Sequence, residues 1–219
     1  MRGTWLCDTC ERSIPRLETG ICFRCGAPLQ SVCRSCAQLD RAIQQARSAF
    51  PYVGWVSTAV RSFKYADERS RAAHLAELMF PMLEILGTFD AIVPVPLHVD
   101  KLRRRGYNQA LLLATAIGVH LNVPVQPMLM RTRDTVSQVT LSREERLANL
   151  TGAFSLDPNW APTPGSHLLL VDDVRTTSST LNACANELVR TGPRHISVAT
   201  LALDLAPREL GAWLEEYGS

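Results

Sequence analysis

The sequence predicts an α/β protein in which helices flank a parallel sheet and a small cysteine-rich zinc-ribbon module comes first. Short apolar runs alternate with segments of helical periodicity, which favours right-handed crossovers within one parallel sheet. Six of the seven cysteines fall in the first 36 residues. Apolar residues make up 46% of the 219 positions, enough for a substantial core.

The cysteines predict a zinc-ribbon domain over residues 1–45, with the α/β domain over residues 46–219. They form three C-x-x-C pairs, each placing two thiolates on one tight turn, which is half of a tetrahedral zinc site. The pairs are Cys7/Cys10, Cys22/Cys25 and Cys33/Cys36. Since this segment has few aliphatic residues, we expect the metal to hold it together.

The favoured zinc ligands are Cys22, Cys25, Cys33 and Cys36, because Gly26 lets the chain turn under the metal. Six cysteines do not divide into sets of four. Three alternatives remain open for Cys7 and Cys10: they exchange with one of the other pairs, stay idle, or are the remnant of a second site. Cys184 is expected in the core.

The spacing of apolar residues predicts the following elements, in chain order. A short helix over residues 39–49 and an extended segment over residues 51–60 lead into a long helix from Asp67 that Pro81 should bend. Further strands are expected at 91–96, 125–130, 168–171 and 196–201, and further helices at 108–121, 178–190 and 207–217.

Two carboxylates, Asp172 and Asp173, follow the fully apolar strand at 168–171. In an open parallel sheet, ligands bind at the carboxyl ends of the strands, and the next helix offers unpaired N–H groups to an anion. The acids suit ribose hydroxyls or a magnesium that carries pyrophosphate. The hydroxyl residues just after the acids, Thr176, Thr177, Ser178, Ser179 and Thr180, add side-chain donors for the same anion. The alternative is a helix cap without a ligand.

A basic segment follows the strand at 91–96 and reaches the same edge of the sheet. Guanidinium groups bind pyrophosphate oxygens in pairs, so this segment is a candidate pyrophosphate site. Its candidate residues are Lys101, Arg103, Arg104 and Arg105. A solvated basic loop is the alternative for each of them, since not all four can point inward. His98 is either a turn residue or an acid or base.

The order of motifs along nearly the whole chain resembles that of the ComF family. The motifs are the cysteine pairs, Phe63-Lys64-Tyr65, Val95-Pro96-Leu97, Arg105-Gly106-Tyr107-Asn108-Gln109, Arg131, Gln138, Leu141, Arg146, Asn149, Gly152-Ala153-Phe154 and the diacid loop. The diacid loop by itself resembles the phosphoribosyl-pyrophosphate (PRPP) motif of type I phosphoribosyltransferases.

The resemblance implies a zinc ribbon before a type I phosphoribosyltransferase-like domain, a cytoplasmic location and a part in DNA uptake during natural transformation. It also implies that Asp172 and Asp173 hold the ribose, and that residues 174–180, with Val174 and Arg175 at their start, hold the 5-phosphate. Residues 97–105 would bind pyrophosphate, and residues 131–149 would close over PRPP. Lys64 belongs to the family pattern without an assigned contact.

The chain departs from the motif at Ser178, where the phosphoribosyltransferases usually have glycine. A Cβ resists positive φ. Either the loop closes in a right-handed helical conformation here, or phosphate is held less tightly.

Two functions fit these features. The first is an enzyme that binds PRPP with Mg²⁺ and transfers its phosphoribosyl group to an acceptor, for which the cysteine-rich module is the only candidate hood. The second is a non-catalytic accessory protein with a vestigial PRPP site that binds single-stranded DNA and DNA-uptake proteins. The net charge of +2 gives no global attraction to nucleic acid or lipid, and no apolar run is long enough for membrane insertion.

Overall fold

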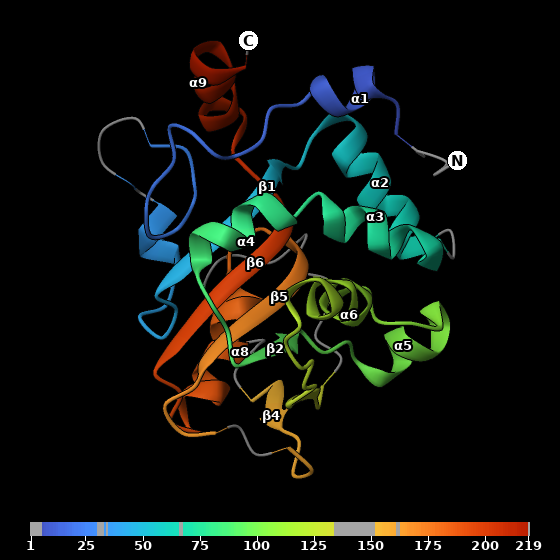
Figure 1. Ribbon diagram of the computed structural model, residues 1–219, viewed down its shortest axis with the longest axis vertical. Coiled ribbons are helices and arrows are strands. Elements are labelled where there is room, and N and C mark those ends of the chain that lie inside the picture. The colour runs from blue at the N-terminus through green and yellow to red at the C-terminus, as the bar shows by residue number, and fades with distance from the viewer. Residues whose placement is uncertain are drawn as a thin grey trace.

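A four-stranded parallel sheet forms the centre of the computed structural model, which describes residues 6–29, 33, 35–65, 68–133, 152–160 and 163–218 (Figure 1). The strands lie in the order β1 (Gln45–Pro51), β6 (His195–Leu203), β5 (His167–Arg175) and β2 (Ala91–Pro94). Every neighbouring pair is parallel. The predicted α/β class with a parallel sheet is therefore confirmed.

Helices cover one face of this sheet. They are α2 (Gly54–Tyr65), α3 (Ala72–Glu77), α4 (Phe80–Leu86) and α6 (Gln109–Leu121). Leu169 and Val171 of β5 pack into this layer, together with Ile92 of β2. Successive side chains of a strand point to opposite faces, so the alternate residues of β5 serve the other layer.

The opposite face is covered by α8 (Ser179–Val189), by the cysteine-rich segment and by an antiparallel pair, β3 (Leu129–Arg131) with β4 (Phe154–Leu156). Leu168 and Leu170 of β5 pack here, beside Cys184 of α8. Because both faces of the sheet are buried, its strands are almost continuously apolar. Cys184 is fully buried, as expected for a core residue.

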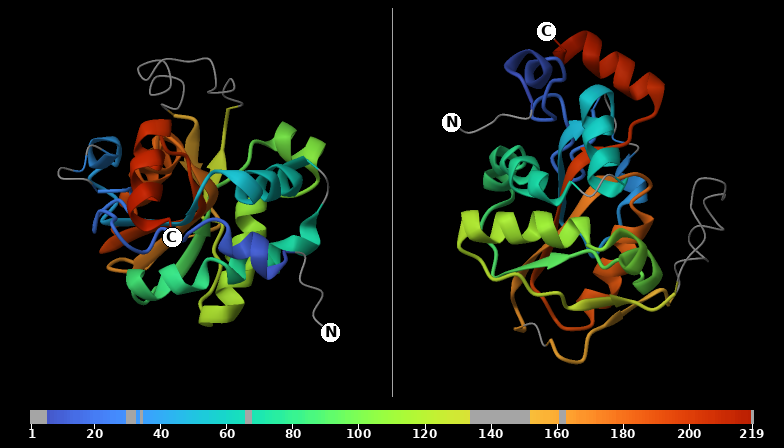
Figure 2. Two further views of the ribbon diagram at one scale, coloured as in Figure 1. Left: turned by 90° about the horizontal axis from the view of Figure 1, so that it is seen from above. Right: turned by 90° about the vertical axis from the view of Figure 1, so that its right-hand side faces the viewer.

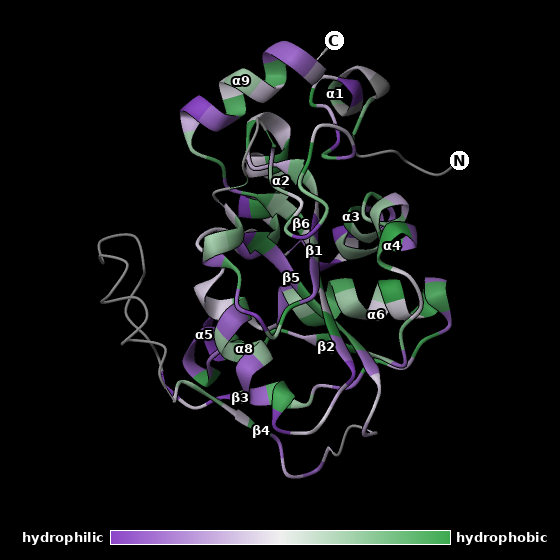
Figure 3. Ribbon diagram, turned by 90° about the vertical axis from the view of Figure 1, so that its left-hand side faces the viewer, coloured by the Kyte–Doolittle hydropathy of each residue, from purple (hydrophilic) through white to green (hydrophobic). Residues whose placement is uncertain are grey.

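The C-terminal helix α9 (Pro207–Tyr217) lies beside the N-terminal segment, although the two are at opposite ends of the sequence (Figure 2). The indole Nε1 of Trp213 donates to the carbonyl of Thr19 at 3.0 Å. Short helices α1 (Asp8–Arg12), α5 (Val99–Arg105), η1 (Ser35–Gln38) and η2 (Arg69–Arg71) complete the described elements. Figure 3 shows both hydrophilic and hydrophobic turns along α9.

The two elements predicted between residues 39 and 60 are wrong. Residues 39–49 do not form a helix, because β1 begins at Gln45, and residues 51–60 are not extended, because α2 begins at Gly54. Almost every residue of β1 is buried by the layers on both sides, including Arg47 and Ser48. Periodicity cannot distinguish such a doubly buried strand from a short helix.

The long helix expected from Asp67 is divided into α3 and α4. Pro81 lies in the first turn of α4, where its missing N–H would have no helical partner in any case. The helices predicted at 108–121, 178–190 and 207–217 are confirmed within one or two residues. No helix in the described part of the chain combines the length and the apolar character that crossing a bilayer requires.

Candidate functional site

The two acids lie inside β5 rather than after it, since this strand continues to Arg175. Hydrogen bonding to β6 extends the strand, with Asp172 opposite Thr200 and Arg175 opposite Leu203. Asp173 is 5% exposed and Asp172 is partly exposed. Both line one cavity of about 860 Å³ at the carboxyl end of the sheet.

This cavity, which we call the diacid cavity, joins residues from five parts of the chain. Five basic residues line it together with the two acids, so basic groups outnumber acidic ones in its wall. The lining residues are Lys64, Tyr65, Val95, Pro96, Leu97, Lys101, Arg104, Arg105, Tyr107, Asn108, Gln109, Ala110, Arg131, Asp172, Asp173, Val174 and Thr180. The volume is within the usual range of small-molecule sites.

Lys64, at the end of α2, forms an ion pair with Asp173, with Nζ 3.0 Å from Oδ2. Burial lowers the pKa of Lys64, but the charges of Asp173 and Asp172 outweigh burial and raise it overall. Burial also raises the pKa of Asp172, to about 7, and the neighbouring charge of Asp173 adds to this rise. The sequence indicates no partner for Lys64, and its only signal is the Phe63-Lys64-Tyr65 motif.

The end of α2 is held by the segment that precedes α6. The carbonyl of Phe63 accepts hydrogen bonds from the hydroxyl of Tyr107 at 2.5 Å and from Nε2 of Gln109 at 3.3 Å. The Arg105 guanidinium donates to Gln109 Oε1 at 2.5 Å. The Phe63-Lys64-Tyr65 motif and the motif at residues 105–109 are therefore in contact in the folded chain, and these contacts position Lys64 against Asp173.

The predicted basic loop is a helix, α5, that ends at Gly106 in the left-handed conformation with φ 79°. Its turns direct Lys101, Arg104 and Arg105 into the diacid cavity. Arg103 does not line this cavity: its side chain is 76% exposed and lies 3.8 Å from Asp100. His98 caps α5, with Nδ1 accepting from the amide of Asp100 at 3.3 Å.

The residues after the acids do not all face the diacid cavity. Val174 and Thr180 line it, whereas Arg175, Thr176, Thr177 and Ser178 border a second cavity of about 650 Å³. The Arg175 side chain turns toward the cysteines and donates to the carbonyl of Cys25 at 2.5 Å. Ser179 bonds Thr177 through their hydroxyls at 2.9 Å.

Ser178 has φ 62° and ψ 0°, which is the left-handed conformation that glycine favours. The alternative of a right-handed helical turn at this position is therefore wrong. Because Ser178 is only 6% exposed, the surrounding residues hold it in a conformation that its Cβ disfavours. The loop keeps the shape of a glycine-containing turn and carries backbone strain.

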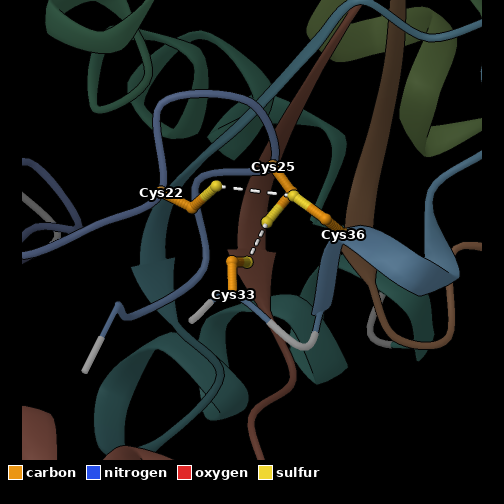
Figure 4. Close-up of side chains that lie close together, drawn as sticks. All are labelled: Cys22, Cys25, Cys33 and Cys36. Carbon is orange, nitrogen blue, oxygen red and sulfur yellow. Dashed lines mark hydrogen bonds between the residues drawn. The ribbon is translucent and has the colours of Figure 1, made fainter. Parts of the chain in front are cut away.

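The four expected metal ligands, Cys22, Cys25, Cys33 and Cys36, form one cluster (Figure 4). Their sulfur atoms all lie within 4.8 Å of one another. In a tetrahedral zinc site with bonds of about 2.3 Å, the sulfur atoms are about 3.8 Å apart, so the donor set suits zinc. A Cβ on Gly26, which has φ 65°, would lie 2.7 Å from the carbonyl oxygen of Ala46. Only glycine fits this close turn, which confirms the expected role of Gly26 in letting the chain turn beside the cysteines.

Cys7 and Cys10 are exposed and lie outside this cluster. The amide of Cys10 donates to the Cys7 sulfur at 3.4 Å, which caps α1. The expected closing segment falls mostly outside the described residues, which resume at Gly152 after Arg133. Its first residue, Arg131, ends β3 and lines the diacid cavity.

No family model matches the chain. Among curated proteins, it is 32% identical to "Competence protein F" of Haemophilus influenzae over 207 residues, which span 90% of both chains. It is 32% identical over 216 residues to "DNA utilization protein YhgH" of Escherichia coli K12, spanning 93% of this chain and 92% of the relative. "Competence protein ComFC" of Bacillus subtilis is 25% identical over 213 residues, which span 90% and 83% of the two chains.

Solved structures of low similarity include adenine phosphoribosyltransferase from Saccharomyces cerevisiae, which is 13% identical with a TM-score of 0.39 over 63% of this chain and 68% of that one. Leishmania donovani UMP synthase is 15% identical with a TM-score of 0.38 over 71% and 31%. The assignment of the chain rests on the curated relatives, whose similarity extends over almost its entire length. Together with the four-cysteine cluster and the parallel sheet, that similarity shows that the chain belongs to the ComF family.

Proposed function

We propose that the diacid cavity binds PRPP with Mg²⁺ and that the chain is a phosphoribosyltransferase-domain protein acting in DNA uptake. The observation that carries this proposal is the composition of the cavity. Two acids and five basic residues meet at the carboxyl end of a parallel sheet, next to the first turn of α8. PRPP combines a diol, a phosphate monoester and a pyrophosphate, and these groups require both kinds of side chain.

Each part of the ligand has a matching set of residues. Asp172 and Asp173 accept hydrogen bonds from the ribose hydroxyls, and the free N–H groups at the start of α8 bind the 5-phosphate. Lys101, Arg104 and Arg105 neutralise the pyrophosphate from α5. Mg²⁺ would neutralise further pyrophosphate charge beside the acids. Arg103 and the side chain of Arg175 have no part in this binding.

As an enzyme, the protein would catalyse displacement of pyrophosphate from the anomeric carbon. The C–O bond breaks with its electron pair on pyrophosphate. The acceptor supplies the electron pair of the new bond to the anomeric carbon and releases its proton to solvent. Positive charge develops on the sugar ring near Asp172 and Asp173, while negative charge develops near the basic residues of α5. The acids would stabilise the positive charge on the sugar and the basic residues the negative charge on pyrophosphate, and both effects would lower the activation free energy.

The second cavity is the proposed entrance for the acceptor. It is bordered by the segment 175–178, which lies between the diacid and the start of α8, and its other walls are the cysteine-rich module, the end of β6 and the start of α9. Asp204, Glu209 and Gln38 supply hydrogen-bond acceptors there. We therefore propose an acceptor with N–H donors, such as a nucleobase with an amino group.

A specific feature favours single-stranded DNA as a further ligand. Tyr65 is 79% exposed at the edge of the diacid cavity, and the Arg105 guanidinium lies 5.2 Å from the centre of its ring. An exposed aromatic ring beside several cations is the arrangement on which unpaired bases stack. The names of the relatives, competence protein and DNA utilization protein, agree with DNA and DNA-uptake proteins as partners.

Calorimetry with PRPP and Mg²⁺ tests the ligand. We expect Arg104→Ala to weaken binding at least fivefold, whereas Arg103→Ala on the same helix serves as the matched control and should leave affinity unchanged. Absence of heat and of thermal shift with millimolar PRPP would overturn the proposal. Pyrophosphate release with a panel of nucleobases then separates an enzyme from a binding protein.

A labelled oligonucleotide tests the DNA proposal separately. Fluorescence anisotropy should show single-strand binding that weakens with salt and with Tyr65→Ala. Affinity that is equal in wild type and Tyr65→Ala and independent of salt would contradict a role for this surface.

A further inference from the structure

Two buried arginines connect the four-cysteine cluster to the sheet. Arg47 of β1 is 3% exposed, and Arg175, the last residue of β5, is 2% exposed. Arg47 Nη2 donates to the carbonyl of Phe23 at 2.8 Å, and Arg175 Nη2 donates to that of Cys25. Both acceptors belong to the turn that carries the first two expected metal ligands.

Neither guanidinium has a carboxylate partner among the described residues, and the Nε atom of each is buried without a hydrogen bond there. The groups beside them that can carry negative charge are the cysteines of the metal-binding turn, because Arg175 bonds the backbone of Cys25 and Arg47 bonds that of Phe23, which lies between Cys22 and Cys25.

This charge pattern discriminates among the possible states of the cysteines. Two guanidinium ions buried without an anion are strongly unfavourable. Four neutral thiols, or two disulfides, would leave both charges uncompensated. Four thiolates around one divalent metal ion carry a net charge of 2−, which matches the two arginines.

We propose that Arg47 and Arg175 are the counter-ions of a metal tetrathiolate centre, and that Arg175 makes the segment Thr176–Ser178 depend on the metal. The second part rests on the proposed function, in which this segment borders the phosphate site.

Arg175 provides a direct route for that dependence. Its side chain bonds the metal-binding turn, and its carbonyl accepts from the amide of Asp204 at 2.8 Å. The next three residues include Ser178 in its strained conformation, which persists only while its surroundings hold it. When the metal leaves, the four thiolates take up protons from solvent and become neutral thiols, so Arg175 loses its compensating anion. Its side chain would then move away from the turn, and the segment Thr176–Ser178 would relax.

The metal part is tested without PRPP, by measuring zinc release from the full chain against a chromogenic chelator. Arg47→Met and Arg175→Met should each weaken zinc binding at least tenfold. The variants Arg47→Lys and Arg175→Lys keep the positive charge, so their zinc affinity should fall by a smaller factor. Arg190→Met, which removes an exposed arginine, is the control for net charge. Zinc release equal to that of wild type in both folded methionine variants would overturn the proposal.

The absorption spectrum of the Co²⁺-loaded wild type keeps the test decisive if a methionine variant does not fold. Charge-transfer intensity for four thiolates supports the charge balance, and intensity for two or three contradicts it.

The loop part is tested by PRPP calorimetry on zinc-loaded variants. Arg175→Met should weaken PRPP binding at least fivefold, because Arg175 directly precedes the segment. Arg47→Met should not, because among the described residues its side chain donates hydrogen bonds only to the carbonyls of Ala46 and Phe23, and it lines neither cavity. Equal PRPP affinity in the two methionine variants would overturn the proposed link between Arg175 and the segment Thr176–Ser178, and it would leave the zinc result unaffected. If wild type itself binds no PRPP, the proposed ligand fails, and the zinc measurements still decide the role of the arginines.

Discussion

Replacing Asp172 with Asn should stabilise the folded protein and at the same time weaken PRPP binding. Burial, followed by the charge of Asp173, raises the pKa of Asp172 from 3.8 to about 7. A carboxyl group whose pKa is raised by folding binds more protons in the native than in the unfolded state. Its contribution therefore lowers stability as the pH rises from about 4 to about 7, and the penalty stays constant above that range.

The size of the effect follows from the shift. A rise of about three pKa units corresponds to a loss of about 4 kcal/mol in the free energy of unfolding when Asp172 is fully ionised and solvent screening is ignored. Asp172 is partly exposed, and solvent screening reduces this figure to on the order of 2 kcal/mol. Asn keeps the oxygen that accepts the amide of Asp173, which lies 2.9 Å from Asp172 Oδ1, so the local hydrogen bond survives.

Denaturant unfolding of wild type and Asp172→Asn at pH 5.5 and pH 8 measures this prediction. The gain in free energy of unfolding should be about twofold larger at pH 8, because the penalty is only partly developed at pH 5.5. Asp173→Asn is the matched variant. It leaves Lys64 without its partner 3.0 Å away, so it should destabilise the protein by on the order of 2 kcal/mol.

A loss of stability in Asp172→Asn at pH 8, or a gain that does not depend on pH, would contradict this prediction. Equal effects of the two substitutions would also contradict it, because they would show that the acids share one environment.

Three further substitutions have expected outcomes. Ser178→Gly should relieve the positive φ and raise stability by about 0.5–1 kcal/mol, read as a higher melting temperature. Gly26→Ala should push against the Ala46 carbonyl and lower bound zinc per chain, measured by atomic absorption; normal zinc content would contradict the packing argument. Tyr107→Phe should cost about 1 kcal/mol of stability in chemical unfolding and weaken PRPP binding, because Phe63 loses a buried hydrogen bond.

Sequence patterns predicted the individual elements of the site, but they did not predict which elements lie next to one another in the folded chain. The four-cysteine set and the helix at 108–121 could be predicted because each depends on residues close in sequence. By contrast, the sequence left His98 undecided between a turn and an acid or base, which its place at the start of α5 resolves as a cap. Lys64 was the main omission, because its partner is more than 100 residues away and no local rule connects α2 to β5.

The sequence by itself determined the α/β class, the set of four cysteines that cluster and the residue types that line the diacid cavity, since periodicity and short spacings are encoded locally. Only the tertiary structure decided that β1 is a strand, that Arg103 faces solvent while Arg104 faces the cavity, and that Arg175 turns to the cysteines. These outcomes depend on which surfaces the sheet buries and which charges it brings together. Such contacts join distant parts of the chain, so no single stretch of sequence contains them.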